Sequence, residues 1–516
     1  MKSAGPPSRR VGVFVALRGI LGMVVVGVMT FIVGGCGSAS DDEARRMIDG
    51  DVRSAVTEVM GQAVAPGFDR VTGPRVFRFP EAHGPHRGFR NEWWYFTGHL
   101  DEPVEGAVIS PERHERLAAG RDGDPLNRAI GAFHLTLFRA ELEPLVDFHR
   151  RWDVEGQGFL RRWATPEVWM GHAAWIDFSS GTHRAEERYV RGAVGLAGAE
   201  RDGRRVWIED WSIESLDAPP VVLRFGIEGD AGDSAPVALT LRLTPERLPV
   251  LQGEAGYSRK GEDPSNASLY YSVPRFGIEG EIDRGRGVER VGGTAWLDRE
   301  WSSSALDEGQ VGWDWFSLQL SNGADLMLYQ MRRSDGRSDP RSKGRWIAPG
   351  AAESREVIRD AVPGAVVGAM SEVTPDNAMA SSDVAAVLAA WTTPEGDRHP
   401  ELGRLLRADD FVLTPLRVAR QSSGRSYPVE WLIDLATEVV DSERERGGES
   451  VWPGLLPWRV VARFDEQEMT TNIPYFEGSV MVFDAHRSPI GRGFLEMTGY
   501  DAVSSTRLES RAFGQD

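Results

Sequence analysis

Hydrophobic and polar residues alternate with a period of two along much of the chain after Arg75. Successive side chains of a strand point to opposite faces, so this pattern is typical of strands. Gly, Asp and Pro separate the runs, and residues 382–396 are an exception that predicts a short helix. The pattern predicts an all-β chain of antiparallel sandwiches or barrels. The predicted strands lie within residues 129–142, 205–216, 237–245, 292–301, 312–320, 324–332, 458–465 and 475–484.

The length of the chain predicts more than one domain. A chain of 516 residues is too long for one ordinary hydrophobic core. A segment rich in Gly, Ser, Pro and Asp at 256–268 marks the expected boundary, which gives an N-terminal domain at 75–255 and a C-terminal domain at 256–510. Residues 101–127 and 335–410 are predicted insertions.

The N-terminus has the order of a secretory signal. Basic residues precede an apolar run at 19–33, and small residues then surround Cys36, the one cysteine of the chain. The stretch Val33-Gly34-Gly35-Cys36 resembles a bacterial lipobox, which implies lipidation of Cys36 and a place on the periplasmic face of a bacterial membrane. A plain membrane anchor with an incidental cysteine is the alternative. Residues 1–36 are then the signal segment, and 37–74 are a tether.

Charge and motifs exclude several classes of function. The net charge of −18 argues against nucleic acid as a partner, because a phosphate backbone requires a basic surface. The chain has no G-x-S-x-G elbow, no H-E-x-x-H helix, no P-loop and no G-x-G-x-x-G after a strand, so no cofactor is expected. Histidine spacing does not support a metal site. The sequence does not indicate an oligomeric state.

Two stretches combine carboxylates with aromatic rings. In RNEWWYFTGHL (90–100), a strand places Glu92 and Trp94 on one face and Trp93 on the other, which puts a carboxylate among rings. In TAWLDREWSS (294–303), a strand places Asp298 and Glu300 on one face, about 7 Å apart. Burial against apolar rings raises the pKa of a carboxyl group, so such an acid can donate a proton near neutrality. The alternative is an acid–arginine pair that ends a strand.

A third aromatic stretch, GWDWFSLQL (312–320), places Trp313, Trp315 and Ser317 on a common face. Taken alone, this pattern is most often part of a hydrophobic core. Together with NEWWYF it predicts a ring-lined cavity suited to a long apolar ligand.

An ordered set of motifs resembles the carotenoid 1,2-hydratase (hydroxyneurosporene synthase)/AttH-like family, in its secreted "predicted hydrolase" branch. The resemblance runs from about Arg75 to Tyr500, and it implies two lipocalin-like antiparallel β-barrel domains side by side, with loop or helix insertions. The motifs are RNEWWYFTGHL, AFHLTLFR, LYYSVPRFGIEGEI, VGGTAWLDREWSSSAL, GWDWFSLQLSNGADLMLYQMR and YFEGSVMVFD followed by GRGFLEMTGY.

The resemblance also implies a chemistry. The hydratase branch adds water to the terminal double bond of an acyclic carotenoid, and the motif match puts its proton-donating aspartate at Asp298, with Trp296 as the aromatic residue upstream. Two positions depart from the family, because Arg299 replaces a histidine and Glu300 replaces the hydratase asparagine. An arginine in contact with Asp298 would lower its pKa and weaken the donor. Strand alternation sends Arg299 to the opposite face.

These observations leave three hypotheses. The first is an enzyme that acts on an isoprenoid or lipid by acid/base chemistry without a metal, with Asp298 as the acid and Glu92, Glu300 or His134 placing water or relaying protons. The second is a lipid-anchored carrier of an apolar ligand, and the third is an envelope scaffold with a filled interior. For either of the first two, the expected ligand contacts are Trp93, Trp94, Tyr271, Trp296, Trp313 and Trp315.

Overall fold

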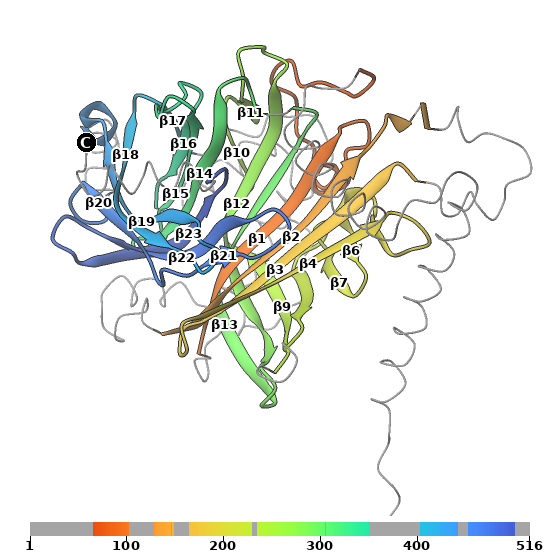
Figure 1. Cartoon of the computed structure of the whole chain (residues 1–516), viewed down its shortest axis with the longest axis horizontal. Helices are drawn as coiled ribbons and strands as arrows, with labels where there is room; N and C mark the ends of the chain where they lie inside the picture. Colours follow the sequence, from red (N-terminus) through yellow and green to blue (C-terminus); the bar gives the residue numbers. More distant parts are fainter. Residues whose placement is uncertain are drawn as a thin grey trace, which may run out of the picture. The chain divides into compact units, whose positions relative to one another are not determined.

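The structure, a computed structural model, describes residues 66–102, 128–145, 147–148, 165–229, 235–304, 306–349, 403–441 and 452–500. Within these ranges the chain is nearly all β, arranged in two antiparallel sheets (Figure 1). One sheet is a nearly closed barrel and the other a half-barrel, which is consistent with two lipocalin-like barrels and confirms the predicted fold class.

The first sheet contains thirteen strands in the order β4-β3-β2-β1-β13-β12-β9-β8-β7-β6-β5, and β10 and β11 pair with β12. Two 3-10 turns, η1 (Glu81–His83) and η4 (Arg201–Gly203), contact each other. The strands are β1 (Asn91–Asp101), β2 (Ala129–Glu141), β3 (Glu167–Asp177), β4 (Thr182–Arg191), β5 (Ala197–Ala199), β6 (Arg205–Ile208), β7 (Trp211–Glu214), β8 (Val221–Ile227), β9 (Val237–Pro245), β10 (Val250–Leu251), β11 (Tyr257–Arg259), β12 (Ala267–Asp283) and β13 (Val288–Ser302).

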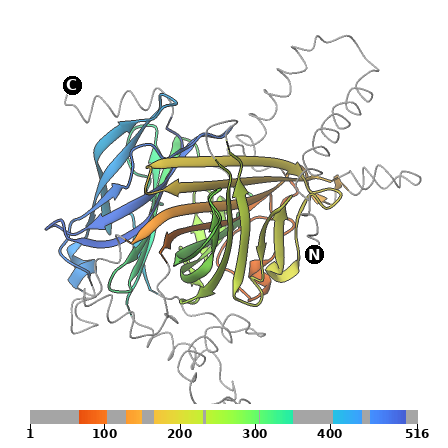
Figure 2. The same ribbon diagram turned by 90° about the horizontal axis from the view of Figure 1, so that it is seen from below.

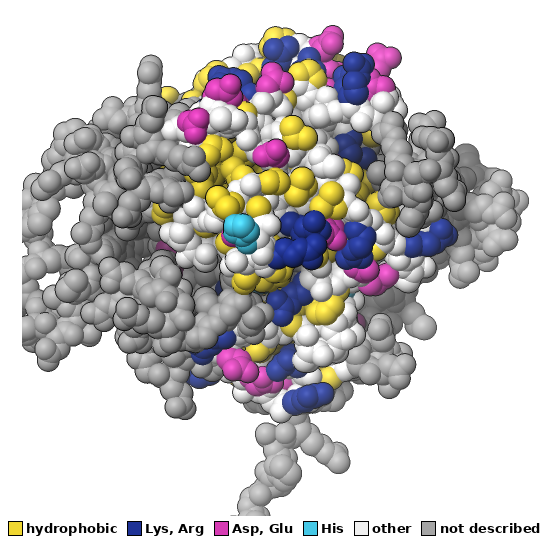
Figure 3. Space-filling model, turned by 90° about the vertical axis from the view of Figure 1, so that its left-hand side faces the viewer, with side chains coloured by type: hydrophobic (Ala, Val, Ile, Leu, Met, Phe, Trp, Pro, Cys, Tyr) yellow, Lys and Arg dark blue, Asp and Glu magenta, His cyan; other side chains and the backbone are white. Residues whose placement is uncertain are grey.

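The second sheet contains ten strands in the order β17-β16-β15-β14-β23-β22-β20-β19-β18, and β21 pairs with β22. On the side of the molecule where this sheet lies, basic and acidic side chains are mixed with hydrophobic ones (Figure 3). The strands are β14 (Gln310–Leu320), β15 (Asp325–Arg333), β16 (Lys343–Ile347), β17 (Arg404–Arg407), β18 (Phe411–Arg420), β19 (Ser426–Leu435), β20 (Trp458–Ala462), β21 (Glu468–Met469), β22 (Tyr475–Phe483) and β23 (Pro489–Met497).

Burial along each strand shows which strands lie between the two sheets. In β9 (VALTLRLTP) buried residues alternate with exposed or half-buried ones, because one face lines the barrel and the other meets water. In β1 nearly every residue is buried, since its outer face lies against the second sheet. The Tyr95 hydroxyl donates to Glu477 at 2.9 Å, and His99 Nε2 lies 2.9 Å from the Ser479 hydroxyl. The orange-to-gold strands of the first sheet accordingly reach the blue strands of the second (Figure 2).

Three hydrophobic clusters follow from this arrangement. The largest fills the interior of the barrel and includes Trp94, Trp169 and Trp301. A second lies on the concave side of the half-barrel and includes Trp346 and Trp458. A third, called here the inter-sheet cluster, draws residues from both sheets. Its buried members are Tyr95, Ala132, Ile176, Tyr270, Trp296, Trp315, Met327, Tyr329, Met331 and Phe494.

The change from one sheet to the other occurs later than the sequence predicts. Strands β12 and β13 follow the predicted boundary at 256 but pair with β9 and β1 of the first sheet. The second sheet begins at Gln310. The segment 256–268, rich in Gly, Ser, Pro and Asp, contains β11 and the turn to β12, because turn-forming residues mark any chain reversal and do not distinguish a loop from a domain boundary.

Two other predicted boundaries change in the structure. Residues 335–410 were expected to be an insertion, but β16 and β17 at its two ends pair with each other and extend the second sheet. Residues 66–74, assigned to the tether, include Val71, which is buried in the barrel core. The signal segment, Cys36, the helix expected at 382–396 and most of the insertion at 101–127 lie outside the described residues. None of the helices within the described ranges has the length and apolar character to span a membrane.

Candidate active site

Strand β13 directs the predicted acids toward the second sheet. Asp298 and Trp296 lie on its outer face, where the inter-sheet cluster forms, while Leu297 and Trp301 belong to the barrel core. Arg299 also points into the barrel, as strand alternation predicts, and it contacts Glu92. The arginine that replaces the family's histidine therefore does not contact Asp298.

Asp298 is a buried carboxyl group surrounded by hydrogen-bond donors. The hydroxyls of Tyr270 and Ser272 donate to its two oxygens, the latter at 2.5 Å, and Trp296 Nε1 donates at 2.7 Å. Burial raises the pKa of Asp298 to about 7, against the opposing effect of these donors and with a contribution from the nearby charge of Glu300. The group can therefore carry a proton near neutral pH.

Glu300 lies two residues along the same face and is paired with a cation. Lys260 Nζ approaches Glu300 at 3.1 Å, and the Ser268 hydroxyl donates to the same carboxylate. Burial alone would lower the pKa of Lys260, but the carboxylate of Glu300 outweighs it and raises that pKa. The ammonium also lies 4.5 Å from the centre of the Tyr329 ring. Glu300 thus forms a buried ion pair with Lys260 beside Asp298.

The second sheet contributes two acids that the sequence did not single out. Glu496 on β23 accepts a hydrogen bond from Trp313 Nε1 at 2.6 Å, and burial with the charges of Asp298 and Glu300 raises its pKa to about 7. Glu477 on β22 accepts from Tyr95, and burial raises its pKa well above the ordinary value. Two carboxyl groups with pKa values near 7, Asp298 and Glu496, therefore approach this cluster from opposite sheets.

The strand register aligns a row of polar side chains on the same face of the first sheet. Direct cross-strand neighbours share a face, with Cβ atoms about 4.5–5.5 Å apart. His172, at the far side of the row from Asp298, lies 2.9 Å from the Tyr475 hydroxyl and 3.0 Å from Glu187. The row runs through Ser272, Asp298, Tyr95, Thr136, His172 and Glu187.

His134, a predicted proton relay, lies beside this row. Its Nε2 is 2.6 Å from the Thr136 hydroxyl and 3.8 Å from Glu477. Burial lowers its pKa well below the ordinary value, so the ring is neutral at physiological pH. The Tyr95 ring packs against it at 5.1 Å between centroids.

The aromatic residues predicted to bind a ligand divide between two places. Trp296 and Trp315 are buried in the inter-sheet cluster, and the half-buried Trp93 and Trp313 pack against it. Trp94 and Tyr271 belong instead to the barrel core. The Tyr271 hydroxyl lies 2.6 Å from His83 Nδ1, and Trp94 stacks on Trp169.

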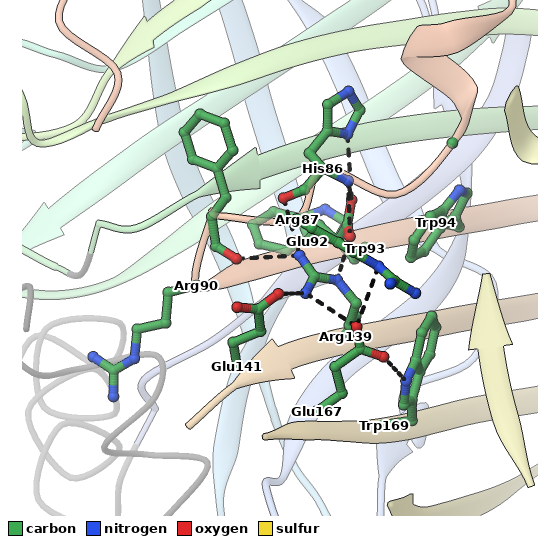
Figure 4. Close-up of polar contacts among 12 residues, drawn as sticks. His86, Arg87, Arg90, Glu92, Trp93, Trp94, Arg139, Glu141, Glu167 and Trp169 are labelled. Carbon is green, nitrogen blue, oxygen red and sulfur yellow. Dashed lines mark hydrogen bonds and ion pairs between the residues drawn. The ribbon is translucent and has the colours of Figure 1, made fainter. Parts of the chain in front are cut away.

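Glu92 also lies apart from Asp298, at the centre of an ion cluster on the barrel side (Figure 4). Arg299 donates to it at 2.8 Å, and Arg139 donates to the other oxygen. The backbone N–H of His86 adds bonds of 3.1 and 3.2 Å. Burial alone would raise the pKa of Glu92, but Arg139, Arg299 and His86 outweigh it and lower that pKa well below its ordinary value.

Glu92 is therefore ionised at neutral pH and neutralises two buried arginines. Arg139 also pairs with Glu141 and donates to the backbone carbonyls of His86 and Phe89, both at 3.1 Å. An ionised group held by two guanidinium groups is a poor proton donor. The sequence grouped Glu92 with Asp298 and Glu300 because of their composition, and the structure separates them onto opposite faces of the first sheet.

A signal for the two missed acids exists in the sequence. Glu477 and Glu496 each interrupt an apolar strand, in YFEGSV and FLEM, as Asp298 does in WLDREW. Both faces of β22 and β23 are largely buried, so an acid on either face becomes desolvated. Among the described residues, no group of three or more His, Cys, Asp or Glu side chains could hold a metal ion.

Comparisons with known proteins agree with this architecture. Residues 124–367, which include Asp298 and Tyr270, match the model of a family described as AttH-like. The matched segment covers just under half of the 516-residue chain and contains most of the first sheet's central strands. A crystal structure assigned to AttH from Nitrosomonas europaea shares 26% sequence identity with this chain at a TM-score of 0.56, and the match covers 84% of this chain and 99% of that one.

A second solved structure, kievitone hydratase from Nectria haematococca, shares 12% identity at a TM-score of 0.46, and the match covers 86% of this chain and 98% of that one. Comparison with curated proteins gives no match. The resemblance of the sequence to the AttH-like family is confirmed by the family match.

Proposed function

We propose that this chain is an acid/base enzyme that adds water to a carbon–carbon double bond of an apolar isoprenoid or lipid substrate. The observation that carries the proposal is the pair Asp298, which is buried, and Glu496, which is half-buried: two carboxyl groups from opposite sheets whose pKa values both lie at about 7. Near neutral pH such a pair can present one proton donor and one proton acceptor at the same time. The surrounding side chains are largely aromatic and suit an apolar substrate.

The proposed reaction follows from this pair. Asp298 transfers its proton to one carbon of the double bond, and the other carbon becomes a carbocation. The indoles of Trp296 and Trp315 stabilise the cation through their π faces. The oxygen of a water molecule bonds to the cation while Glu496 accepts one of its protons, and proton exchange with solvent restores both carboxyl groups. One molecule of water is added in total.

The same pair can also serve double-bond isomerisation or hydrolysis. In isomerisation, Glu496 removes a proton from a carbon next to the cation, so no oxygen enters the product. In hydrolysis, the acid protonates a leaving group and the base activates water. An isotope label separates these reactions, because hydration alone adds a solvent oxygen to an otherwise intact skeleton.

The cell-envelope location is part of the proposal. A basic region, an apolar run and Cys36 in a lipobox-like position support export and lipid attachment of the N-terminus. A membrane-attached enzyme would meet an apolar substrate where such molecules are dissolved. Carriage of an apolar ligand without chemistry is the second candidate, and the aromatic residues of the inter-sheet cluster favour it equally.

The test is incubation of the purified chain with acyclic carotenoids and polyprenyl lipids in ¹⁸O-labelled water, followed by mass spectrometry. We expect one solvent oxygen in the product and a rate about 10²–10⁴-fold lower in Asp298→Asn and Glu496→Gln. Glu289→Gln, on the same strand as Asp298 but paired with Arg284 at the surface, is the matched control and should keep the rate. Recovery of the lipids unaltered would favour a carrier, and full activity of Asp298→Asn would exclude the assigned acid.

A further inference from the structure

Among the described residues, three of the buried polar atoms that lack a hydrogen-bond partner lie on β1, β2 and β22 in the inter-sheet region. They are Thr97 Oγ1, His134 Nδ1 and Glu477 Oε2. All three side chains are almost completely excluded from solvent, with exposures of 1% or less. Buried polar groups are nearly always paired in folded proteins, so an unpaired one calls for an explanation. Three that lie near one another indicate a place where a polar ligand atom binds.

The strand register brings these residues together. Thr97 on β1 is the direct cross-strand neighbour of His134 on β2. Glu477 reaches the same place from the second sheet, because its Oε2 lies 3.8 Å from His134 Nε2 while its Oε1 accepts from Tyr95 at 2.9 Å. Thr97 and Glu477 therefore both lie next to the His134 side chain, one on the neighbouring strand and the other on the opposite sheet.

The chemistry of the three groups identifies the ligand class. Burial raises the pKa of Glu477, so the group is protonated and can donate through the oxygen that Tyr95 does not use. Burial lowers the pKa of His134, so its neutral ring has one donor and one acceptor nitrogen. The Thr97 hydroxyl both donates and accepts. A set of uncharged donors and acceptors matches a hydroxyl group, which also does both, and gives no net charge to attract an ion.

We propose that Thr97, His134 and Glu477 form a subsite that binds a hydroxyl oxygen. Its place in the reaction rests on the proposed function. Tyr95 is the direct neighbour of Asp298 on β13, and Thr97 is the direct neighbour of Trp296 on the same strand. The subsite thus lies beside the acid, on the side of His134. The hydroxyl has two sources: the water molecule that adds to the double bond, or an alcohol group of the substrate itself.

The experiment compares two probes with the same isoprenoid skeleton, farnesol with a hydroxyl and farnesene without one. Binding to the purified full chain is followed by quenching of tryptophan fluorescence. If the hydroxyl comes from the substrate, the farnesol-to-farnesene affinity ratio should be about tenfold higher in the wild type than in Glu477→Leu, because a site built for a hydroxyl discriminates against an analogue without one. Taking the ratio between variants cancels the difference in probe solubility.

Conservative variants keep the result interpretable if Glu477→Leu does not fold. Thr97→Val is nearly isosteric and should lower the same affinity ratio, whereas Glu477→Gln retains a donor and should preserve it. Circular dichroism and the thermal midpoint of each variant check the fold. Glu289→Gln serves as the surface control.

The second arm tests water as the source. In that case the farnesol-to-farnesene affinity ratio is the same in the wild type and the variants, and Thr97→Val and Glu477→Leu still bind farnesene but lose incorporation of solvent ¹⁸O into the product. The subsite would be overturned by equal affinity ratios in the wild type and all variants, together with ¹⁸O incorporation that the variants leave unchanged or that is undetectable already in the wild type. Since the binding arm requires no turnover, a substrate-hydroxyl site would be detected even if the proposed reaction were disproved.

Discussion

Replacement of Glu92 by Gln tests whether this acid is structural or catalytic. Gln keeps the size and one acceptor oxygen of the side chain but removes the charge that neutralises Arg139 and Arg299. Both arginine side chains are fully buried. The variant therefore leaves an uncompensated positive charge inside the barrel.

The size of the effect follows from the partners that remain. Breaking a buried ion pair from one side typically costs about 3–5 kcal/mol. Arg139 keeps Glu141, and Arg299 keeps the carbonyl of Trp93 at 3.1 Å and lies over the Trp94 ring at 3.7 Å. These partners reduce the loss, so we expect the free energy of unfolding to fall by about 2–4 kcal/mol at pH 7.

Urea unfolding followed by tryptophan fluorescence measures this loss, and its pH dependence has a defined sign. The pKa of Glu92 is lower in the folded state than its ordinary value of 4.5. The stabilisation is thus fully present above about pH 4.5 and declines as the pH falls toward the folded-state pKa. The difference between wild type and variant should be largest at neutral pH and shrink in acid.

The control for the Glu92→Gln variant is the loss of an acid from a partly exposed ion pair. Glu289→Gln breaks a partly exposed pair with Arg284 and should change stability by less than about 1 kcal/mol. If Glu92→Gln were as stable as the wild type yet had lost turnover, the ion cluster would not be structural and Glu92 would have the catalytic role that the sequence suggested.

Three further predictions concern the pH profile, the Lys260–Glu300 pair and the N-terminus. The rate of water addition should peak near pH 7, because Glu496 must be ionised and Asp298 protonated. Glu496→Gln should abolish the fall of this rate on the acid side. A rate that does not depend on pH in the wild type would contradict this assignment. Lys260→Met should destabilise the chain by about 3–5 kcal/mol in urea unfolding, and the double variant with Glu300→Gln should recover most of the loss. Cys36→Ser should abolish labelling by a fatty-acid analogue and release the chain from membranes; labelling that persists would exclude lipidation at Cys36.

Much of the fold could be predicted from the period-two pattern, because a strand with one buried face has hydrophobic residues at every second position. Strands such as β2, β9 and β22 coincide closely with predicted runs. Strand β4 escaped prediction because charged and half-buried residues occupy both of its faces. Strand β18 escaped prediction because Pro415 interrupts it and because apolar Val412 and Leu416 lie on exposed positions, which hides the alternation. The first sheet continues past the predicted boundary at 256 because β12 and β13 pair with β9 and β1, and such pairing depends on register between distant segments, which local composition does not encode.

The site could be predicted only in part. Alternation within one strand was enough to place Asp298 and Glu300 together and Arg299 opposite. It also placed Glu92 among aromatic rings, but composition could not reveal that two arginines from β2 and β13 reach it. Glu477 and Glu496 come from a different sheet, and their proximity to Asp298 follows only from how the two sheets pack.

The proposed mechanism is best tested by measuring the protonation state of Asp298. Infrared difference spectra of the wild type against Asp298→Asn, recorded across a pH series, isolate the carboxylic acid band of this one side chain. We expect this band to disappear with a midpoint near pH 7, because burial raises the pKa of Asp298 to about 7. A midpoint near the ordinary aspartate value of about 4 would show a solvated carboxylate that cannot act as the proposed acid.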